Sequence, residues 1–364
     1  MNGALKRLWS VGWRLAVAGI LMTWAFHAIF HDQVRELLAS RGEDLDALAR
    51  TQRWITVWKL GPAEFAATLW KVRPGWLLVS VLLWGITIVL GGWRWLLVLR
   101  SQGLDPGWRR TLEISFVAHF FNSFLLGSTG GDLLKAYYAA RVTRHLKTEA
   151  VASVLIDRVV GLFAMLGFAV AAIVPNLDLV LRHHRTLALG LVVLGMFSAA
   201  SAALFLSLRG GVSRVFPKAR DRLRRLPKAE TLERGLEACR ALGRRPVLFW
   251  QSVGISVLLT LVCILQLQTL VWGYGLDAPL MPVSWIVPSV ICISALPVTP
   301  SGLGVRDYLY LYLLNLPEVG IPAGTAIAIS LVAYAASLVW SALGGLFYVL
   351  MRSDHDLSDA MADR

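Results

Sequence analysis

Six long apolar stretches constrain this chain more than any other feature of its 364-residue sequence. About 20 apolar residues in a helix cross the roughly 30 Å hydrocarbon layer of a bilayer, and each stretch reaches that length. Only 16% of the residues are charged, against about 25% in soluble domains. The sequence therefore predicts an all-α, polytopic helical membrane protein with a single transmembrane domain, and excludes a soluble enzyme. The predicted spans are residues 9–30, 75–99, 150–175, 186–208, 246–272 and 322–351.

Two further apolar stretches decide the topology, because glycine, proline, serine and threonine interrupt them. They form predicted broken elements at residues 111–138 and 283–314. Basic segments 100–110 and 135–147 flank the first element, and basic loops of membrane proteins stay in the cytoplasm. The first element should therefore enter and return as a re-entrant element, and the second should do so from the opposite face. Eight full crossings are the alternative, but they place segment 135–147 outside.

The connecting loops set the predicted orientation. Residues 209–245 contain twelve Lys or Arg and four acidic residues, which places this basic loop in the cytoplasm together with both termini. The net charge of +13 comes from such loops, so it indicates a cell (inner, cytoplasmic) membrane protein and no nucleic-acid binding. Residues 31–74 carry mixed charge and should form an external loop with short interfacial helices. Trp54, Trp58 and Trp70 would anchor these helices at headgroup depth.

The two broken elements are similar in sequence. Residues 120–141 read FFNSFLLGSTGGDLLKAYYAAR, and residues 293–314 read ISALPVTPSGLGVRDYLYLYLL. An offset of 171 residues aligns a glycine, a cation four residues later and a tyrosine two residues further. With opposite entry into the membrane, this pattern predicts an inverted repeat, an arrangement in which transporters place the substrate site at the repeat interface. The aligned pairs are Leu125 with Leu296, Ser128 with Thr299, Gly131 with Gly302, Lys135 with Arg306, and Tyr137 with Tyr308.

Each broken element also offers the chemistry of a phosphate site. Asp132 is expected to cap the helix after the first break, and Thr299 or Ser301 the helix after the second. A cation in a first helical turn is unfavourable unless an anion sits there, and backbone N–H groups at a helix start bind phosphate. The alternative is that the glycines allow close packing while Lys135 extends to the membrane interface. The predicted lipid-headgroup residues are Asn122, Ser128, Gly130, Gly131, Asp132, Lys135, Arg158, Thr299, Ser301, Gly302, Gly304 and Arg306.

Several ionisable residues lie inside apolar stretches. Asp157 and Arg158 stand about ten residues into their span, roughly 15 Å along a helix. Consecutive helical residues do not face each other, so at least one of the two should point to another element. An ion pair that only fixes helix orientation is the other interpretation. Arg94 is expected to be an interfacial anchor, and the candidates for proton coupling are Glu113, His119, Asp157 and Asp307.

These motifs resemble the lysylphosphatidylglycerol synthase transmembrane region family, which includes flippase-like and UPF0104-type integral membrane proteins. The resemblance spans nearly the whole chain. It implies a lipid translocation module that lacks the soluble aminoacyl-transferring domain. The family pattern usually has Arg in the first motif and Glu in the other two, where this chain has Lys135, Asp157 and Asp307. The residues on which the resemblance rests are Gly130, Gly131, Asp132 and Lys135, then Asp157 and Arg158, then Pro297, Ser301, Gly302, Gly304, Val305, Arg306 and Asp307.

The sequence thus predicts a transporter or flippase that moves a phosphate-bearing lipid, such as a phospholipid or polyprenyl phosphate, between leaflets. Membrane lipids are the expected partners, with lipid-biosynthesis proteins as further candidates. One alternative is a membrane-embedded lipid-modifying enzyme using Asp157, Asp307 or His119 as acid or base, although no catalytic constellation appears. A second is an accessory subunit of a lipid pathway. The three cysteines lack metal-ligand spacing, so no metal or cofactor is expected.

Overall fold

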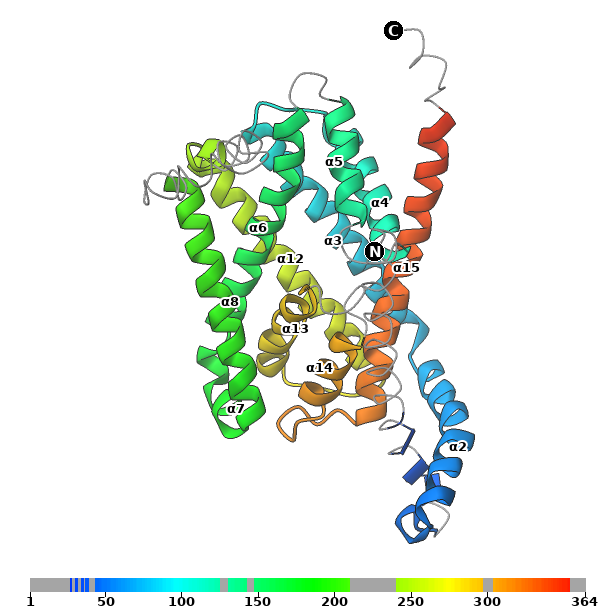
Figure 1. Ribbon diagram of the computed structural model, residues 1–364. Helices are drawn as coiled ribbons and strands as arrows, with labels where there is room; N and C mark the ends of the chain where they lie inside the picture. The colour runs from blue at the N-terminus through cyan, green and yellow to red at the C-terminus, as the bar shows by residue number, and fades with distance from the viewer. Residues whose placement is uncertain are drawn as a thin grey trace, which may run out of the picture. The chain divides into compact units, whose positions relative to one another are not determined.

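The structure is a computed structural model in which every regular element among the described residues is a helix. It describes residues 27, 30, 31, 34, 35, 37, 38, 43–124, 130–142, 147–209, 240–296 and 304–353. The predicted span 9–30 lies almost wholly outside these residues, as does most of the basic loop 209–245. The helices are α2 (Arg50–Trp70), α3 (Pro74–Ser101), α4 (Trp108–Phe124), α5 (Gly130–Val142), α6 (Lys147–Ala171), α7 (Leu177–Arg182), α8 (His184–Arg209), α12 (Pro246–Gly273), α13 (Leu280–Ser294), α14 (Val305–Leu314) and α15 (Ala323–Ser353) (Figure 1).

Five of the six predicted spans are confirmed as helices long and apolar enough to cross a membrane. Their surfaces remain apolar where they are exposed, as at Leu187, Leu191 and Leu194 on α8. A soluble helix would carry polar residues on such a face, whereas lipid favours this composition. The spans are Pro74–Ser101, Glu149–Ala171, His184–Phe205, Pro246–Gly273 and Ala323–Tyr348.

The chain divides into two compact units, which we describe separately. Unit 1 contains Met1–Trp84, Ala171–Gly190 and Cys263–Ser337. Unit 2 contains Gly85–Val170, Leu191–Val262 and Leu338–Arg364. The chain passes from one unit to the other within α3, α6, α8, α12 and α15. Each of these helices therefore contributes residues to both units.

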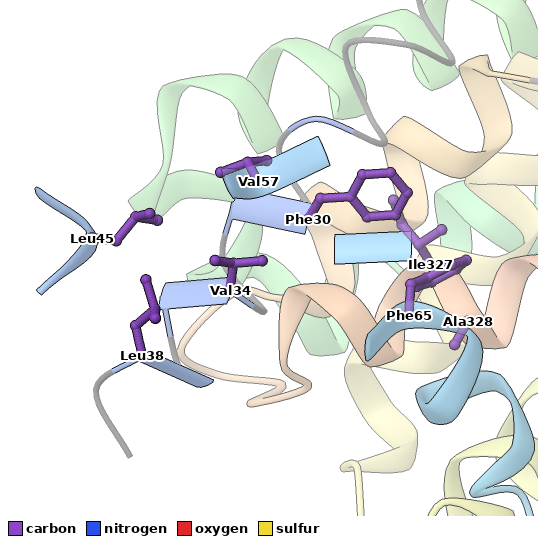
Figure 2. Packing of buried hydrophobic residues seen from close by; sticks show 8 residues of the cluster. All are labelled: Phe30, Val34, Leu38, Leu45, Val57, Phe65, Ile327 and Ala328. Carbon is purple, nitrogen blue, oxygen red and sulfur yellow. The ribbon is translucent and has the colours of Figure 1, made fainter. Parts of the chain in front are cut away.

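In unit 1, α2 occupies residues for which the sequence predicts short interfacial helices. It is one helix of 21 residues, because Val57, Gly61 and Phe65 recur every four residues and form one buried stripe. A Cβ at Gly61 would lie 2.3 Å from the Cβ of Phe30, so glycine permits this close approach. Figure 2 shows the resulting cluster, which includes residues of α15. Its members are Phe30, Val34, Leu38, Leu45, Val57, Phe65, Ile327 and Ala328.

Both predicted broken elements consist of two helices that pack against each other. In unit 2, α4 lies beside α5, and in unit 1, α13 packs against α14 (Figure 1). The intervening residues 125–129 and 297–303 lie outside the described residues. A Cβ at Gly131 would come within 2.0 Å of the Ala118 carbonyl oxygen, so glycine is required where α5 meets α4. Gly131 therefore serves helix packing, as one interpretation of the sequence proposed.

Candidate functional site

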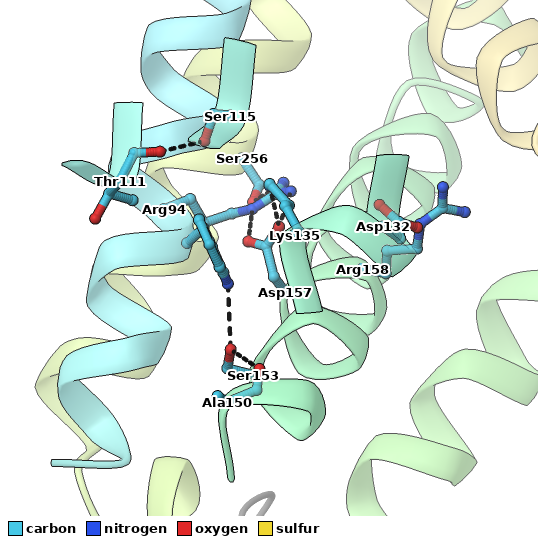
Figure 3. A network of polar contacts seen from close by, with 11 residues as sticks. Arg94, Thr111, Ser115, Asp132, Lys135, Ala150, Ser153, Asp157, Arg158 and Ser256 are labelled. Carbon is cyan, nitrogen blue, oxygen red and sulfur yellow. Dashed lines mark hydrogen bonds and ion pairs between the residues drawn. The ribbon is translucent and has the colours of Figure 1, made fainter. Parts of the chain in front are cut away.

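A buried carboxylate, Asp157, joins three helices of unit 2. Its two oxygens accept hydrogen bonds from Arg94 of α3, with Oδ1 lying 2.7 Å from Nε and Oδ2 lying 3.2 Å from Nη2 (Figure 3). The Nζ atom of Lys135, on α5, lies 3.8 Å from Oδ2. The side chains of Arg94 and Lys135 are each 14% exposed, and that of Asp157 is 7% exposed. Charges in such an apolar setting are stable only when paired.

Neighbouring side chains hold the two cations in place. Arg94 Nη1 also donates to Ser256 Oγ of α12 at 3.2 Å. Lys135 Nζ lies 4.6 Å from the centre of the Trp95 ring, a cation–π contact. Gly161 leaves room for the guanidinium, because a Cβ there would lie 2.4 Å from Arg94 Nη1. The sequence places this glycine one helical turn after Asp157, on the same face of α6.

A second ion pair adjoins this centre. Arg158 pairs with Asp132 of α5, whereas Asp157 contacts Arg94 and Lys135. The two consecutive charged residues of α6 therefore have different partners. This confirms the expectation that at least one of them faces another element. Asp132 lies in the first turn of α5, which begins at Gly130, so its predicted role as the helix cap is wrong.

Asn122 of α4 contacts the Gly131 amide at the start of α5. Its Oδ1 accepts the Gly131 N–H at 2.8 Å. The prediction that this amide is open to a phosphate is therefore wrong for the arrangement described here. Asn122 itself, a predicted headgroup residue, instead fixes the start of α5 against α4.

The five charged groups of this cluster do not cancel. Arg94, Lys135 and Arg158 supply three positive charges, whereas Asp132 and Asp157 supply two negative charges. Lys135 interacts electrostatically with all four of the others. The cluster, which we call the Asp157 cluster, therefore carries one formal positive charge in excess. This excess favours the binding of an anion.

Unit 1 contains a smaller buried pair at the start of α14. Asp307 is 2% exposed, and its Oδ1 accepts from Arg306 Nη2 at 3.1 Å and from Ser330 Oγ at 2.5 Å. Arg306 also lies over the Tyr334 ring at 5.0 Å. We call these four residues the Asp307 cluster. Gly304 precedes the helix with a φ of 84°, a left-handed conformation that favours glycine.

The start of α14 differs from the predicted one. The helix begins at Val305, so Thr299 and Ser301 are too far upstream to cap it, and the cap position is Gly304. The Gly304 N–H donates to Asp307 Oδ2 at 3.0 Å, so this amide is not open to a phosphate in the described arrangement.

The other predicted residues fall in different places. Glu113 pairs with Arg109 and Arg110 of its own helix, both at 3.2 Å, and His119 lies half-buried on α4. The predicted headgroup residues Ser128, Thr299, Ser301 and Gly302 lie outside the described residues, as does Pro297 of the resemblance motif. Among the described residues, no group of three His, Cys, Asp or Glu side chains is close enough to hold a metal ion.

Arg94 is a further residue that the sequence interpretation placed wrongly. The expected interfacial anchor instead belongs to the Asp157 cluster, with its side chain 14% exposed. A cation within the apolar run LGGWRWLL is a signal that could have identified it, since an intramembrane charge is functional by default. Ser256 and Ser330 gave no such signal, because hydroxyl side chains are common inside transmembrane helices.

Long apolar helices and charge clusters buried between them define a multi-pass helical membrane protein. Residues 51–345 match the family described as Lysylphosphatidylglycerol synthase TM region, and the chain belongs to this family. It is also similar to two proteins of Methanothermobacter thermautotrophicus, each named UPF0104 membrane protein. One is 25% identical over 263 residues, which cover 68% of this chain and 77% of the relative. The other is 25% identical over 309 residues, covering 79% and 86%.

Proposed function

We propose that this protein is a flippase-like transporter that moves a phosphate-bearing lipid between leaflets. The observation that carries the proposal is the excess positive charge of the Asp157 cluster, formed by residues of three helices in apolar surroundings. A lipid phosphate supplies the missing negative charge. Arginine and lysine bind phosphate through charge-assisted hydrogen bonds, and the lipid tails remain in the bilayer.

The Asp157 carboxylate has a specific part in this proposal. Its Oδ2 lies 3.8 Å from Lys135 Nζ. Arg94 donates shorter hydrogen bonds, of 2.7 Å to Oδ1 and 3.2 Å to Oδ2. The lysine is therefore the more weakly held of the two cations. An arriving phosphate would take Lys135 as a partner while Arg94 continues to neutralise Asp157. No buried charge is left unpaired at any stage, which keeps the cost of binding low.

The order of the helices supports an inverted repeat as part of the same proposal. Helices α3 and α12 each contain 28 residues, begin with proline and precede a pair of helices separated by a break. Arg94 and Gln266 each lie twenty residues after the first residue of their helix. Arg94 binds Ser256 of α12 at 3.2 Å, and Gln266 binds Ser80 of α3 at 2.9 Å. Such reciprocal bonds are expected when two repeats run in opposite directions through the membrane, with both termini cytoplasmic.

Reconstituted protein in liposomes tests the proposal. Fluorescent anionic phospholipid should cross between leaflets, and a Lys135→Ala/Arg306→Ala double variant should lose this activity. Lys135→Arg should retain it, since the charge and phosphate affinity remain. Arg141→Ala is the matched control, because Arg141 is an exposed cation in the last turn of α5. Wild-type rates in the double variant, with folding verified by gel filtration, would refute the proposal.

The same preparation distinguishes the alternative functions. A lipid-modifying enzyme would change the headgroup of the supplied lipid, which mass spectrometry of the liposomes would detect. An accessory subunit would show no translocation alone and would gain activity only with a lipid-pathway protein added. We propose transport without headgroup chemistry, so the lipid recovered from both leaflets should be unchanged.

A further inference from the structure

A shallow pocket in unit 1, distant in sequence from the charge clusters, lies where two predicted spans end. It has a volume of about 430 Å³ and is lined by Arg73, Trp76, Trp272, Gly275 and Leu276. Helix α3 begins at Pro74, and α12 ends at Gly273. Its two tryptophans therefore lie in the terminal turns of two antiparallel membrane helices. Tryptophan is enriched at this depth, where the bilayer meets water.

A backbone hydrogen bond and a glycine turn border the pocket. The Arg73 N–H donates to the Gly273 carbonyl at 2.9 Å, which ties the start of α3 to the end of α12. Gly275 adopts a φ of 73°, which turns the chain sharply after α12. The Trp76 and Trp272 rings lie 5.3 Å apart at 54°. The arginine side chain is thereby placed beside a preformed aromatic pair.

The charge at this pocket is positive. Arg73 is the one charged residue among the five that line it, and its side chain is exposed. Within the part of the chain that the structure describes, no carboxylate pairs with this guanidinium. The first turn of α3 contains no acidic residue either.

We propose that this pocket, which we call the Arg73 pocket, binds the phosphate headgroup of an anionic lipid at one membrane boundary. The guanidinium binds the phosphate, and the half-buried tryptophans contact the glycerol and the upper part of the acyl chains. Inorganic phosphate offers the same charge but nothing for the aromatic pair, so the ligand is the lipid. This inference does not rest on the proposed transport function, which depends on other residues.

Native mass spectrometry of the full-length protein tests the inference. Detergent-solubilised protein is titrated with phosphatidylglycerol, with phosphatidylcholine and inorganic phosphate as separate arms. Arg73→Gln should weaken retention of phosphatidylglycerol about tenfold, the factor that corresponds to losing one moderate charge-assisted hydrogen bond. Lys71→Gln is the matched control, because Lys71 is an exposed cation two residues away that does not line the pocket. It should retain the lipid as the wild type does.

Further variants separate the possible outcomes. Trp76→Leu should also reduce retention, whereas the Lys135→Ala/Arg306→Ala double variant should retain lipid at the Arg73 pocket even if transport fails. Arg73→Gln should fold normally, since its backbone bond to Gly273 is unchanged. Equal retention by wild type and Arg73→Gln would overturn the inference. Displacement of the lipid by millimolar inorganic phosphate would overturn the lipid assignment and indicate a simple anion site.

Discussion

Replacing Gly161 by alanine is the sharpest test of the Asp157 cluster, because it adds one methyl group and no charge. The new Cβ would lie 2.4 Å from Arg94 Nη1 and 2.8 Å from its Cζ, whereas ordinary contacts begin near 3.4 Å. The guanidinium must therefore move by about 1 Å (3.4 − 2.4 Å). Such a movement breaks at least one of its hydrogen bonds to Asp157, which are 2.7 and 3.2 Å long.

The expected cost follows from two opposing effects. Losing one hydrogen bond between charged groups costs about 1.5–3 kcal/mol. Alanine in place of glycine within a helix returns about 0.5–1 kcal/mol. Gly161→Ala should therefore lower the free energy of unfolding by about 0.5–2.5 kcal/mol. Gly91→Ala on α3 is the control, because nothing lies within 4 Å of its Cβ position and only the favourable helix effect remains.

Reversible unfolding in mixed micelles, followed by tryptophan fluorescence, measures this difference. A double-mutant cycle strengthens the test, since the cost of Gly161→Ala should disappear in an Arg94→Met background that has no guanidinium to displace. The reasoning fails if Gly161→Ala is as stable as Gly91→Ala. It also fails if the alanine costs the same in both backgrounds, because the clash would then involve groups other than Arg94.

Two further predictions concern other parts of the chain. Gly344→Ala should destabilise the protein by more than about 1–3 kcal/mol, the usual cost of overpacking. The new Cβ would lie 2.1 Å from the backbone carbonyl oxygen of Phe116, which cannot move aside as a side chain can. The same unfolding assay measures this cost, and a stability equal to that of Gly91→Ala would contradict the prediction. A hydrogen bond from its own backbone, aided by His183, lowers the pKa of Glu318 below its usual 4.5. The wild type should therefore be more stable than Glu318→Gln above pH 4.5, and this advantage should vanish as the pH falls through the lowered pKa. An advantage that grows on acidification in thermal melts would show that the sign is wrong.

Much of the fold was predictable because the bilayer imposes a length on every helix that crosses it. The apolar runs beginning near Pro74 and Pro246 predict spans whose ends agree with α3 and α12 to within two residues. The two breaks were also visible, because glycine and proline interrupt apolar stretches there. Asp157 was recognisable as a functional candidate for the same reason, since a charge in an apolar helix needs a partner.

The identity of that partner was decided only by the tertiary structure. Arg94 precedes Asp157 by 63 residues, and no local periodicity connects them. The fold also brings Lys135 Nζ to 3.8 Å from Asp157 Oδ2, a contact that the sequence interpretation did not include. Hydropathy determines which segments leave water, because that free energy is a property of each segment by itself. Helix packing determines which charges meet, because the energy of an ion pair depends on the distance between two groups that distant parts of the chain supply.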